Sequence, residues 1–267
     1  MLAADRKKRH NFCYSQKLRP FLRQLKQALG LFKLGFILMK NSVINSFEDI
    51  LKVARSHDHD HFIYRGENNS SYLLHPKFGR YNASTRSDSV KTEQDVLREF
   101  KRRSTPYITN TPENDYEWLA LAQHHGLSTR LLDWSKNIFV AIFFAVGDIE
   151  KNQNGDRILY AISEKVFSEI NVDISPFNTD SVNIYKPKHL ANRIVAQMGL
   201  FTLHPKPSEI FNHEKLERWV IKEDAIIDLA VSLDSFGFNI STMFPDLDGL
   251  SQHINDWNLH GERETKA

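Results

Sequence analysis

The stretch AQHHGLSTRLLDW, residues 122–134, gathers side chains that can do chemistry. It combines two histidines, two hydroxyl side chains, an arginine and an aspartate with large apolar residues that include Leu131, Leu132 and Trp134. A surface loop has no need of these apolar side chains, and a core segment accepts the charged ones only where they find partners. The pattern therefore predicts the half-buried wall of a functional site.

Five polar residues of this stretch are candidates for the site. Asp133 is a candidate general acid or base, because a partly apolar wall would shift the pKa of its carboxyl group. The alternative is that Asp133 simply forms an ion pair with Arg130. Ser128 and Thr129 would either orient a substrate or cap the next helix. His125 would line the same wall.

Two further candidates lie outside this stretch. In Tyr64-Arg65-Gly66-Glu67, an arginine at the end of a predicted strand places a five-donor guanidinium beside the bare backbone of a glycine, which suits a bidentate contact with phosphate. The alternative is an ion pair between Arg65 and Glu67. Gln197 would either hydrogen-bond a ligand or satisfy buried backbone groups.

Other kinds of site have less support. His57, His59 and His61 alternate with two aspartates, so an extended segment would place three imidazoles on one face. We interpret this segment as a solvated loop and expect no metal, because metal sites usually take ligands from separate elements and hold them through surrounding groups. The sequence has no P-loop, no dinucleotide-binding glycine pattern and no nucleophile elbow. Phosphoryl transfer from ATP and serine-hydrolase chemistry are therefore disfavoured.

The elements that must position these residues follow from hydrophobic periodicity. The pattern predicts helices at 45–56, 89–104, 115–125 and from 241 to 253, with Gly126 as a C-cap. The composition of 137–146 fits a buried strand or a buried helix, and the spacing of Ala141 and Ala145 favours the helix. It predicts strands at 61–67, 156–163, 193–205 and 215–222. Strands and helices are interspersed without the regular alternation of a doubly wound sheet. The expected fold class is therefore α+β, a single mixed domain with a central split or twisted sheet flanked by helices.

Charge divides the chain into two parts. Residues 1–40 carry a formal charge of +9 and the remainder carries −7. We expect residues 1–43 to be a basic amphipathic leader, helical or poorly ordered, and 44–267 to be the α+β domain. The leader offers a nucleic acid a binding site, and its apolar run is too short, and is interrupted by Lys33, to span a membrane. A single cysteine fits a reducing compartment, so the cytoplasm is expected.

Several motifs occur in an order that resembles one known family, the FRG domain, which is named for an aromatic-Arg-Gly motif near its start. They are FIYRGE, HPKFGR, EQDVLREFKRR, WLALAQHHGLSTRLLDWSKNIFVAIFFA, RIVAQMGLF and FPDLDGL. The resemblance covers about residues 46–255. Ser128 and Ile138 stand where a proline is more usual in this family, and neither departure removes a polar candidate.

The order of these motifs also resembles, more distantly, the ADP-ribosyltransferase superfamily. That resemblance implies that Arg65 holds the pyrophosphate or the nicotinamide ribose of NAD and that Thr129 braces the ligand. The reaction would break a C–N glycosidic bond through an oxocarbenium-like transition state. Gln197 stands where such an enzyme would have a glutamate, and a neutral amide stabilises developing positive charge poorly. Asp133 or another carboxylate would then serve, or the domain would bind a nucleotide without converting it.

The expected function is therefore an ADP-ribosyltransferase-like enzyme that cleaves NAD and transfers ADP-ribose to an unknown macromolecular or small-molecule acceptor. The first alternative is a non-catalytic nucleotide-binding or sensing module, and the second is a hydrolase or nuclease built from His124, His125 and Asp133. The catalytic candidates are Arg65, Asp133, Gln197 and His125. The candidates for binding NAD are Tyr64, Arg65, Gly66, Ser128, Thr129 and Arg130.

Overall fold

The structure is a computed structural model that describes residues 42–57, 61–80, 89–147, 155–188 and 192–256. The predicted leader lies outside the described residues apart from its last two positions, so its helix and its nucleic-acid partner stay predictions. The described residues from 42 to 256 belong to one compact unit. Among the described residues, no helix combines the length and the apolar character needed to cross a membrane.

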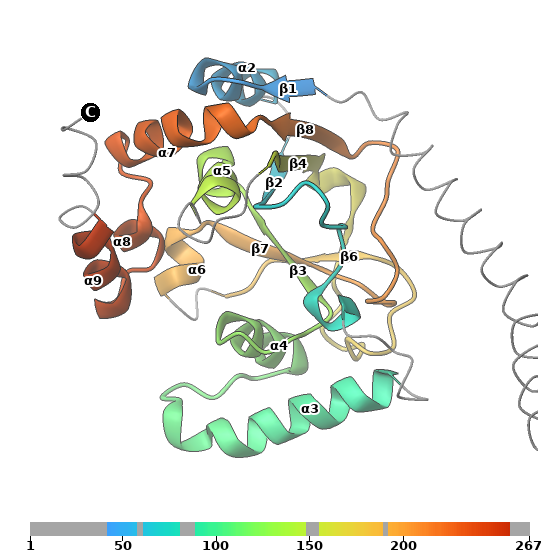
Figure 1. Ribbon diagram of the computed structural model, residues 1–267. Coiled ribbons are helices and arrows are strands. Elements are labelled where there is room, and N and C mark those ends of the chain that lie inside the picture. Colours follow the sequence, from blue (N-terminus) through green and yellow to red (C-terminus); the bar gives the residue numbers. More distant parts are fainter. Residues whose placement is uncertain (1–41, 58–60, 81–88, 148–154, 189–191, 257–267) are drawn as a thin grey trace, which may run out of the picture. The chain divides into compact units, whose positions relative to one another are not determined.

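Within the described residues, eight strands form one sheet in the order β1-β8-β4-β2-β3-β7-β6-β5 (Figure 1). Their bounds are β1 (Ser42–Ile44), β2 (Phe62–Glu67), β3 (Leu131–Ser135), β4 (Arg157–Ser163), β5 (Ser168–Glu169), β6 (Asn183–Tyr185), β7 (Gly199–Leu203) and β8 (Glu217–Ile221). The pairs β1–β8 and β5–β6 are parallel and the others are antiparallel. This mixed sheet flanked by helices confirms the predicted α+β class.

The helices are α2 (Phe47–Ser56), α3 (Ser89–Ser104), α4 (Asp115–His124), α5 (Ile138–Val146), α6 (Asn192–Ala196), α7 (Ile226–Ser235), α8 (Ile240–Met243) and α9 (Leu247–Asn255). Four of the helices, α2 to α5, follow predicted ranges, whereas α7 was not predicted. Ser46 caps α2 by accepting a hydrogen bond from the backbone N–H of Asp49. Gly126 follows the end of α4 with a φ of +86°, which suits its predicted capping role.

The sheet is split between its two central strands. β2 pairs with β4 along all six of its residues, and β3 pairs with β7 along all five of its own. β2 and β3, in contrast, pair only at Tyr64 and Ser135. The sheet therefore consists of two halves, β1-β8-β4-β2 and β3-β7-β6-β5, that meet at one backbone pair.

Each half has its own apolar core. The first half packs against α2, α5 and α7, with buried residues that include Ile50, Ile142 and Leu229. The second half packs against α3 and α4, with buried residues that include Leu97 and Leu119 (Figure 1). The core is therefore divided at the same place as the sheet. The strand ends between the two halves are available for a site.

Gly66 allows α5 to lie directly on β2. A Cβ atom at this position would lie 1.8 Å from the carbonyl oxygen of Ala141 in α5. Any larger residue would therefore push the helix and strand apart. The glycine of the predicted Arg-Gly pair serves this close packing, and it also lies on the wall of the pocket described below.

Two predicted elements are wrong in part. The strand predicted at 193–205 begins with the helix α6, and its strand β7 starts only at Gly199, because Met198 adopts a left-handed turn with a φ of 46°. The single helix predicted from 241 to 253 is two helices, α8 and α9. Pro245 lies between them, and it lacks the backbone N–H that a continuous helix needs.

Candidate functional site

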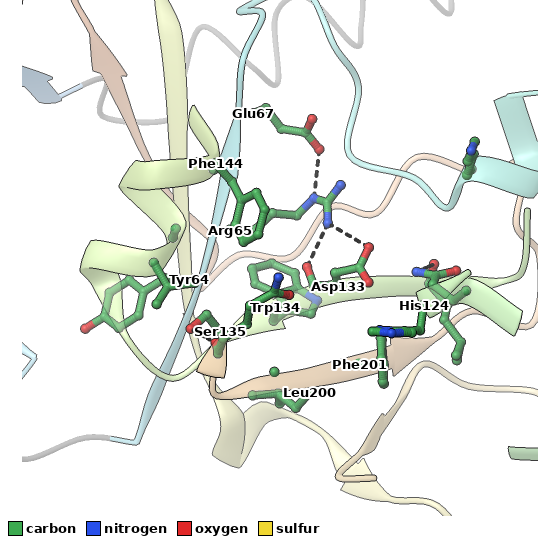
Figure 2. A pocket seen from close by; sticks show the side chains of 18 of the residues that line it. Tyr64, Arg65, Glu67, His124, Asp133, Trp134, Ser135, Phe144, Leu200 and Phe201 are labelled. Atoms are coloured by element: carbon green, nitrogen blue, oxygen red, sulfur yellow. Dashed lines mark hydrogen bonds and ion pairs between the residues drawn. The ribbon is translucent and has the colours of Figure 1, made fainter. Parts of the chain in front are cut away.

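A pocket of about 400 Å³ lies where the two halves of the sheet separate (Figure 2). Its size falls within the range common for small-molecule sites, about 300–1,000 Å³. β2, β3, β7, α4, α5 and α6 all contribute to its wall. The lining residues with charged or titratable side chains are Tyr64, Arg65, Glu67, Lys77, Arg80, His124, Asp133 and Arg193.

Arg65 bridges the split in the sheet. Its Nε donates to Glu67 Oε1 at 2.7 Å, and its Nη1 donates to the backbone oxygen of Asp133 at 2.8 Å (Figure 2). The same Nη1 lies 3.5 Å from Asp133 Oδ2. A side chain of β2 thus contacts the β3 backbone where the two strands no longer pair. The alternative prediction of an Arg65–Glu67 ion pair is confirmed, and Asp133 joins it.

Glu67 and Asp133 stabilise the protonated, positively charged form of Arg65. Burial acts to lower the pKa of Arg65, whose side chain is only 14% exposed, and the carboxylates of Glu67 and Asp133 raise it by more. Arg65 therefore presents a fixed positive charge at the mouth of the split. Such a preorganised guanidinium is suited to an anionic ligand.

Glu67 is a pocket carboxylate that the sequence patterns indicated only as a partner of Arg65. It is buried, and it lies 3.8 Å from Arg80 Nη2 as well as 2.7 Å from Arg65 Nε. Arg80 and Lys77 come from the short 3-10 helix Lys77–Arg80, which brings two more cations to the pocket. The alternation of side chains along a strand, which places residues 65 and 67 on one face, was the available signal.

Asp133 faces Arg65 from β3, and its side chain is 59% exposed. The alternative prediction that it pairs with Arg130 is wrong. Arg130 is fully buried, and its Nε and Nη2 donate to Glu93 Oε2 of α3 at 2.9 and 2.8 Å. Its Nη1 donates to the backbone oxygen of Pro176. Because Arg130 pairs with Glu93, the Asp133 carboxylate has no ion pair with Arg130 and faces Arg65 in the pocket.

Three residues predicted to bind the ligand, Ser128, Thr129 and Arg130, are not on the pocket wall. Thr129 is buried, with its hydroxyl donating to Gln123 Oε1 and accepting from the backbone N–H of Leu131. These hydrogen bonds give Thr129 a structural role, because they connect it to Gln123 of α4 and to Leu131 of β3. The roles of the three residues toward a ligand stay predictions that need a bound complex.

The two histidines at the end of α4 are placed differently. His124 lies on the pocket wall, whereas His125 is exposed and is not among the lining residues. Their rings meet edge to face with centroids 4.8 Å apart. The prediction placed His125 on the wall, but the structure places His124 there. His125 occupies the C-cap of α4, where the chain turns away from the helix.

Gln197 and Tyr64 both reach the pocket wall and are both already hydrogen-bonded. The Gln197 side chain donates from Nε2 to the backbone oxygen of Met243 at 3.1 Å. The Tyr64 side chain points away from Arg65 in Figure 2, and its hydroxyl lies 3.0 Å from His57 Nδ1. Burial, followed by the charge of Glu217, raises the pKa of Tyr64 to about 12. Its hydroxyl therefore stays protonated.

Aromatic side chains form much of the remaining wall. Trp134, Phe144 and Phe201 line the pocket, and flat apolar faces of this kind suit a heterocyclic ring. Trp134 Nε1 donates to Thr202 Oγ1 at 2.9 Å, and Thr202 Oγ1 lies 2.9 Å from His204 Nε2. The indole is thus fixed by a buried polar chain behind the pocket.

Among the described residues, no three His, Cys, Asp or Glu side chains are grouped so that they could hold a metal ion. His57 is buried and stacks on Phe62, with ring centroids 3.7 Å apart. His61 is 72% exposed in its side chain, and His59 lies outside the described residues. The described histidines of the alternating segment thus lie in different surroundings.

Comparison with known proteins gives one match. The model of the FRG domain family matches residues 60–154, which include Arg65, Glu67, Arg80 and Asp133 of the pocket. The comparisons with curated proteins and with solved structures gave no match. The chain therefore contains an FRG domain, and Arg65, Lys77 and Arg80 of the pocket lie within it.

Proposed function

We propose that this chain binds NAD in the pocket at the sheet split and acts as an ADP-ribosyltransferase-like enzyme. The observation that carries the proposal is the position of Arg65, which reaches across the split to Asp133 at the mouth of a pocket with aromatic walls. This arrangement combines a fixed cation for phosphate, a carboxylate close to it, and flat surfaces for the two rings of a dinucleotide.

The basic side chains on and beside β2 would bind the diphosphate. Arg65 is the central donor, with Arg80 and Lys77 on the same side of the pocket. A phosphate that reaches Arg65 competes with Glu67 for the guanidinium. Arg80, already 3.8 Å from Glu67, then gives this carboxylate an alternative partner, so Glu67 stays paired in the complex.

Cleavage requires stabilisation of positive charge on the ribose. The bond between ribose C1′ and the nicotinamide nitrogen breaks, and its electron pair leaves with nicotinamide. A nucleophile of the acceptor then bonds to C1′ and loses its proton. Asp133 is the carboxylate that stabilises the developing charge, because it is exposed in the pocket and Glu67 is held between two arginines.

A non-catalytic nucleotide-binding module is the second candidate function, and one observation favours it. Gln197 stands at the position where the superfamily resemblance implies a glutamate, and its amide is tied to the backbone of Met243. A neutral, immobilised amide cannot replace a carboxylate in stabilising an oxocarbenium ion. If Asp133 does not supply that charge, the domain binds NAD and leaves it intact.

A combined binding and product assay separates these two functions. We expect NAD at about 100 times its Kd to stabilise the full chain by about 2.7 kcal/mol in thermal unfolding. Arg65→Lys removes the two-donor fork and should abolish this stabilisation. Asp133→Asn should retain it and lower the rate of nicotinamide release about 100-fold. Arg98→Gln is the matched control, since Arg98 is an exposed arginine of α3 that does not line the pocket.

Each result has a direct reading. Stabilisation without nicotinamide release by the wild type would identify the binding module. Release that is unchanged in Asp133→Asn would exclude Asp133 as the stabilising carboxylate. Absence of any stabilisation by saturating NAD in the wild type would exclude both candidate functions.

A further inference from the structure

Arg193 differs from the other arginines of the pocket in its partners. It lies on α6 beside the second half of the sheet and lines the same pocket as Arg65. Arg65 is bound by two acidic residues. For the Arg193 side chain, the described part of the chain offers no ion pair and no hydrogen bond. Its guanidinium lies 3.9 Å above the ring of Phe244. Stacking of this kind leaves the edge of the planar group able to donate to a ligand.

The C-terminal FPDLDGL motif builds the support for this stack. Asp246 caps α9 by accepting a hydrogen bond from the backbone N–H of Gly249 at 2.8 Å. A Cβ atom at Gly249 would lie 2.0 Å from the backbone oxygen of Phe244, so only glycine permits this close turn. Phe144, a pocket residue, meets the Phe244 ring edge to face. The motif thus fixes the ring that holds Arg193.

His124 provides a second donor close to Arg193. Burial lowers the pKa of His124, and the nearby charges of His125 and Arg193 lower it further, whereas Asp246 raises it. These are the charged groups that act on His124 from its own helix end, from α6 and from α9. Burial lowers the pKa of Arg193, and the carboxylates of Asp133 on β3 and of Asp246 act to raise it. Two basic side chains therefore lie within electrostatic reach of each other on one wall.

We propose that Arg193 and His124 form a second anion subsite of the pocket, which receives a phosphate group of the bound nucleotide. This inference rests on the proposed function, because it takes the ligand to be a nucleotide diphosphate. Arg65 extends from β2 in the first half of the sheet, whereas Arg193 belongs to the helix that leads into β7 in the second half. A ligand held by both arginines therefore spans the split.

The subsite also makes binding sensitive to pH. A bound anion favours the protonated imidazole and so raises the pKa of His124 in the complex. By linkage, affinity for the anion increases as pH falls through the raised pKa that His124 has in the complex. ADP-ribose is a suitable probe, because its diphosphate does not change its charge between pH 8 and pH 6. An increase in its affinity over this range therefore comes from the protein.

Calorimetric titration of the full chain with ADP-ribose tests the subsite. We expect Arg193→Gln to weaken binding about tenfold or more at pH 8, and Arg193→Lys, which keeps the charge without the fork, to weaken it less. Phe244→Leu should also weaken binding, because it removes the stacked ring. His124→Gln should abolish the gain in affinity between pH 8 and pH 6. Arg98→Gln on α3 serves as the control, and unliganded thermal midpoints verify that each variant folds.

The outcomes distinguish this inference from the proposed function. Wild-type affinity in both Arg193 variants, together with lost binding in Arg65→Lys, would overturn the subsite and leave the proposed NAD site intact. An unchanged pH dependence in His124→Gln would remove His124 from the subsite. Absence of ADP-ribose binding by the wild type would overturn both proposals. Inorganic pyrophosphate, titrated in parallel, should bind more weakly than ADP-ribose, and equal affinity would show a site for free phosphate in place of a nucleotide.

Discussion

The two halves of the sheet are stabilised in different ways. The half formed by β1, β8, β4 and β2 packs against α2, α5 and α7 mainly through aliphatic and aromatic side chains. The half formed by β3, β7, β6 and β5 buries a complete ion pair between Arg130 and Glu93, together with the Trp134–Thr202–His204 chain. Buried polar groups need fixed partners, so the second half has less freedom to rearrange around its pocket residues.

This difference assigns distinct tasks to the two halves. The first half presents Arg65 and Glu67 from one strand that is held by close packing with α5. The second half holds Trp134 through a hydrogen bond to Thr202, and Asp133 accepts a hydrogen bond from Arg65 across the split. Mutations that disturb packing in the first half and polar partners in the second half therefore test whether the distinction is real.

Removal of the buried ion pair should have the largest effect. Glu93→Ala leaves the guanidinium of Arg130, which is fully buried, without its carboxylate partner. Loss of one member of such a pair costs about 3–5 kcal/mol of the free energy of unfolding. Urea unfolding measures this change. Glu99→Ala, which removes an exposed carboxylate of the same helix, should have little effect, and a similar loss in both variants would contradict the importance of the buried pair.

Close packing in the first half predicts the next effect. Gly66→Ala places a Cβ atom 1.8 Å from the Ala141 oxygen, so α5 and β2 must separate at a cost of about 1–3 kcal/mol. Gly126→Ala has open space around its Cβ and suffers only from its φ of +86°, which costs about 1 kcal/mol. Chemical denaturation compares the two variants. A larger loss for Gly126→Ala would show that α5 adjusts easily.

The third prediction concerns the acid sensitivity of the second half. Burial, followed by the charges of Arg65 and His75, lowers the pKa of His204 to about 3, so the folded protein keeps this imidazole neutral. The unfolded chain takes up the proton below a pKa of about 6.5. The free energy of unfolding therefore falls as pH decreases from 6.5 toward 3, by up to about 1.4 kcal/mol per pH unit.

His204→Gln tests this contribution, because glutamine can hydrogen-bond to Thr202 without titrating. Urea unfolding at pH 7 and pH 5 should show a smaller decrease in stability for the variant than for the wild type. Equal decreases in both proteins would mean that His204 is protonated in the folded state. In that case the polar chain behind Trp134 would adapt to pH.

Local sequence patterns predicted the helices that are determined by residues close together in the chain. α3 occupies the predicted range 89–104, and α2 ends at the predicted residue 56. Such signals depend on residues within one or two turns of each other. β3 received no prediction as a strand, because the five residues of LLDWS are buried at four positions and show no alternation between apolar and polar side chains.

The pocket could be predicted only in part for the same reason. Arg65 and Asp133 were identified from their types and neighbours, but the partner of Arg130 lies 37 residues earlier in the chain, and no spacing reveals it. Arg193 and Gln197 were assigned to a strand, whereas Arg193 lies on the helix α6 and Gln197 follows directly after it, and both line the pocket. Their positions depend on Phe244 and Met243, which are brought close by tertiary structure.

The single backbone pair between Tyr64 and Ser135 has a mechanical consequence. A regular ladder resists twisting because several hydrogen bonds must break together, whereas a one-pair junction can act as a pivot with each ladder intact. Beside this pivot, the Arg65 side chain adds a hydrogen bond from β2 to the β3 backbone. A ligand that draws the guanidinium away from Asp133 would remove this cross-strand contact and leave the Tyr64–Ser135 pair as the backbone pairing of β2 with β3 in the described part of the chain.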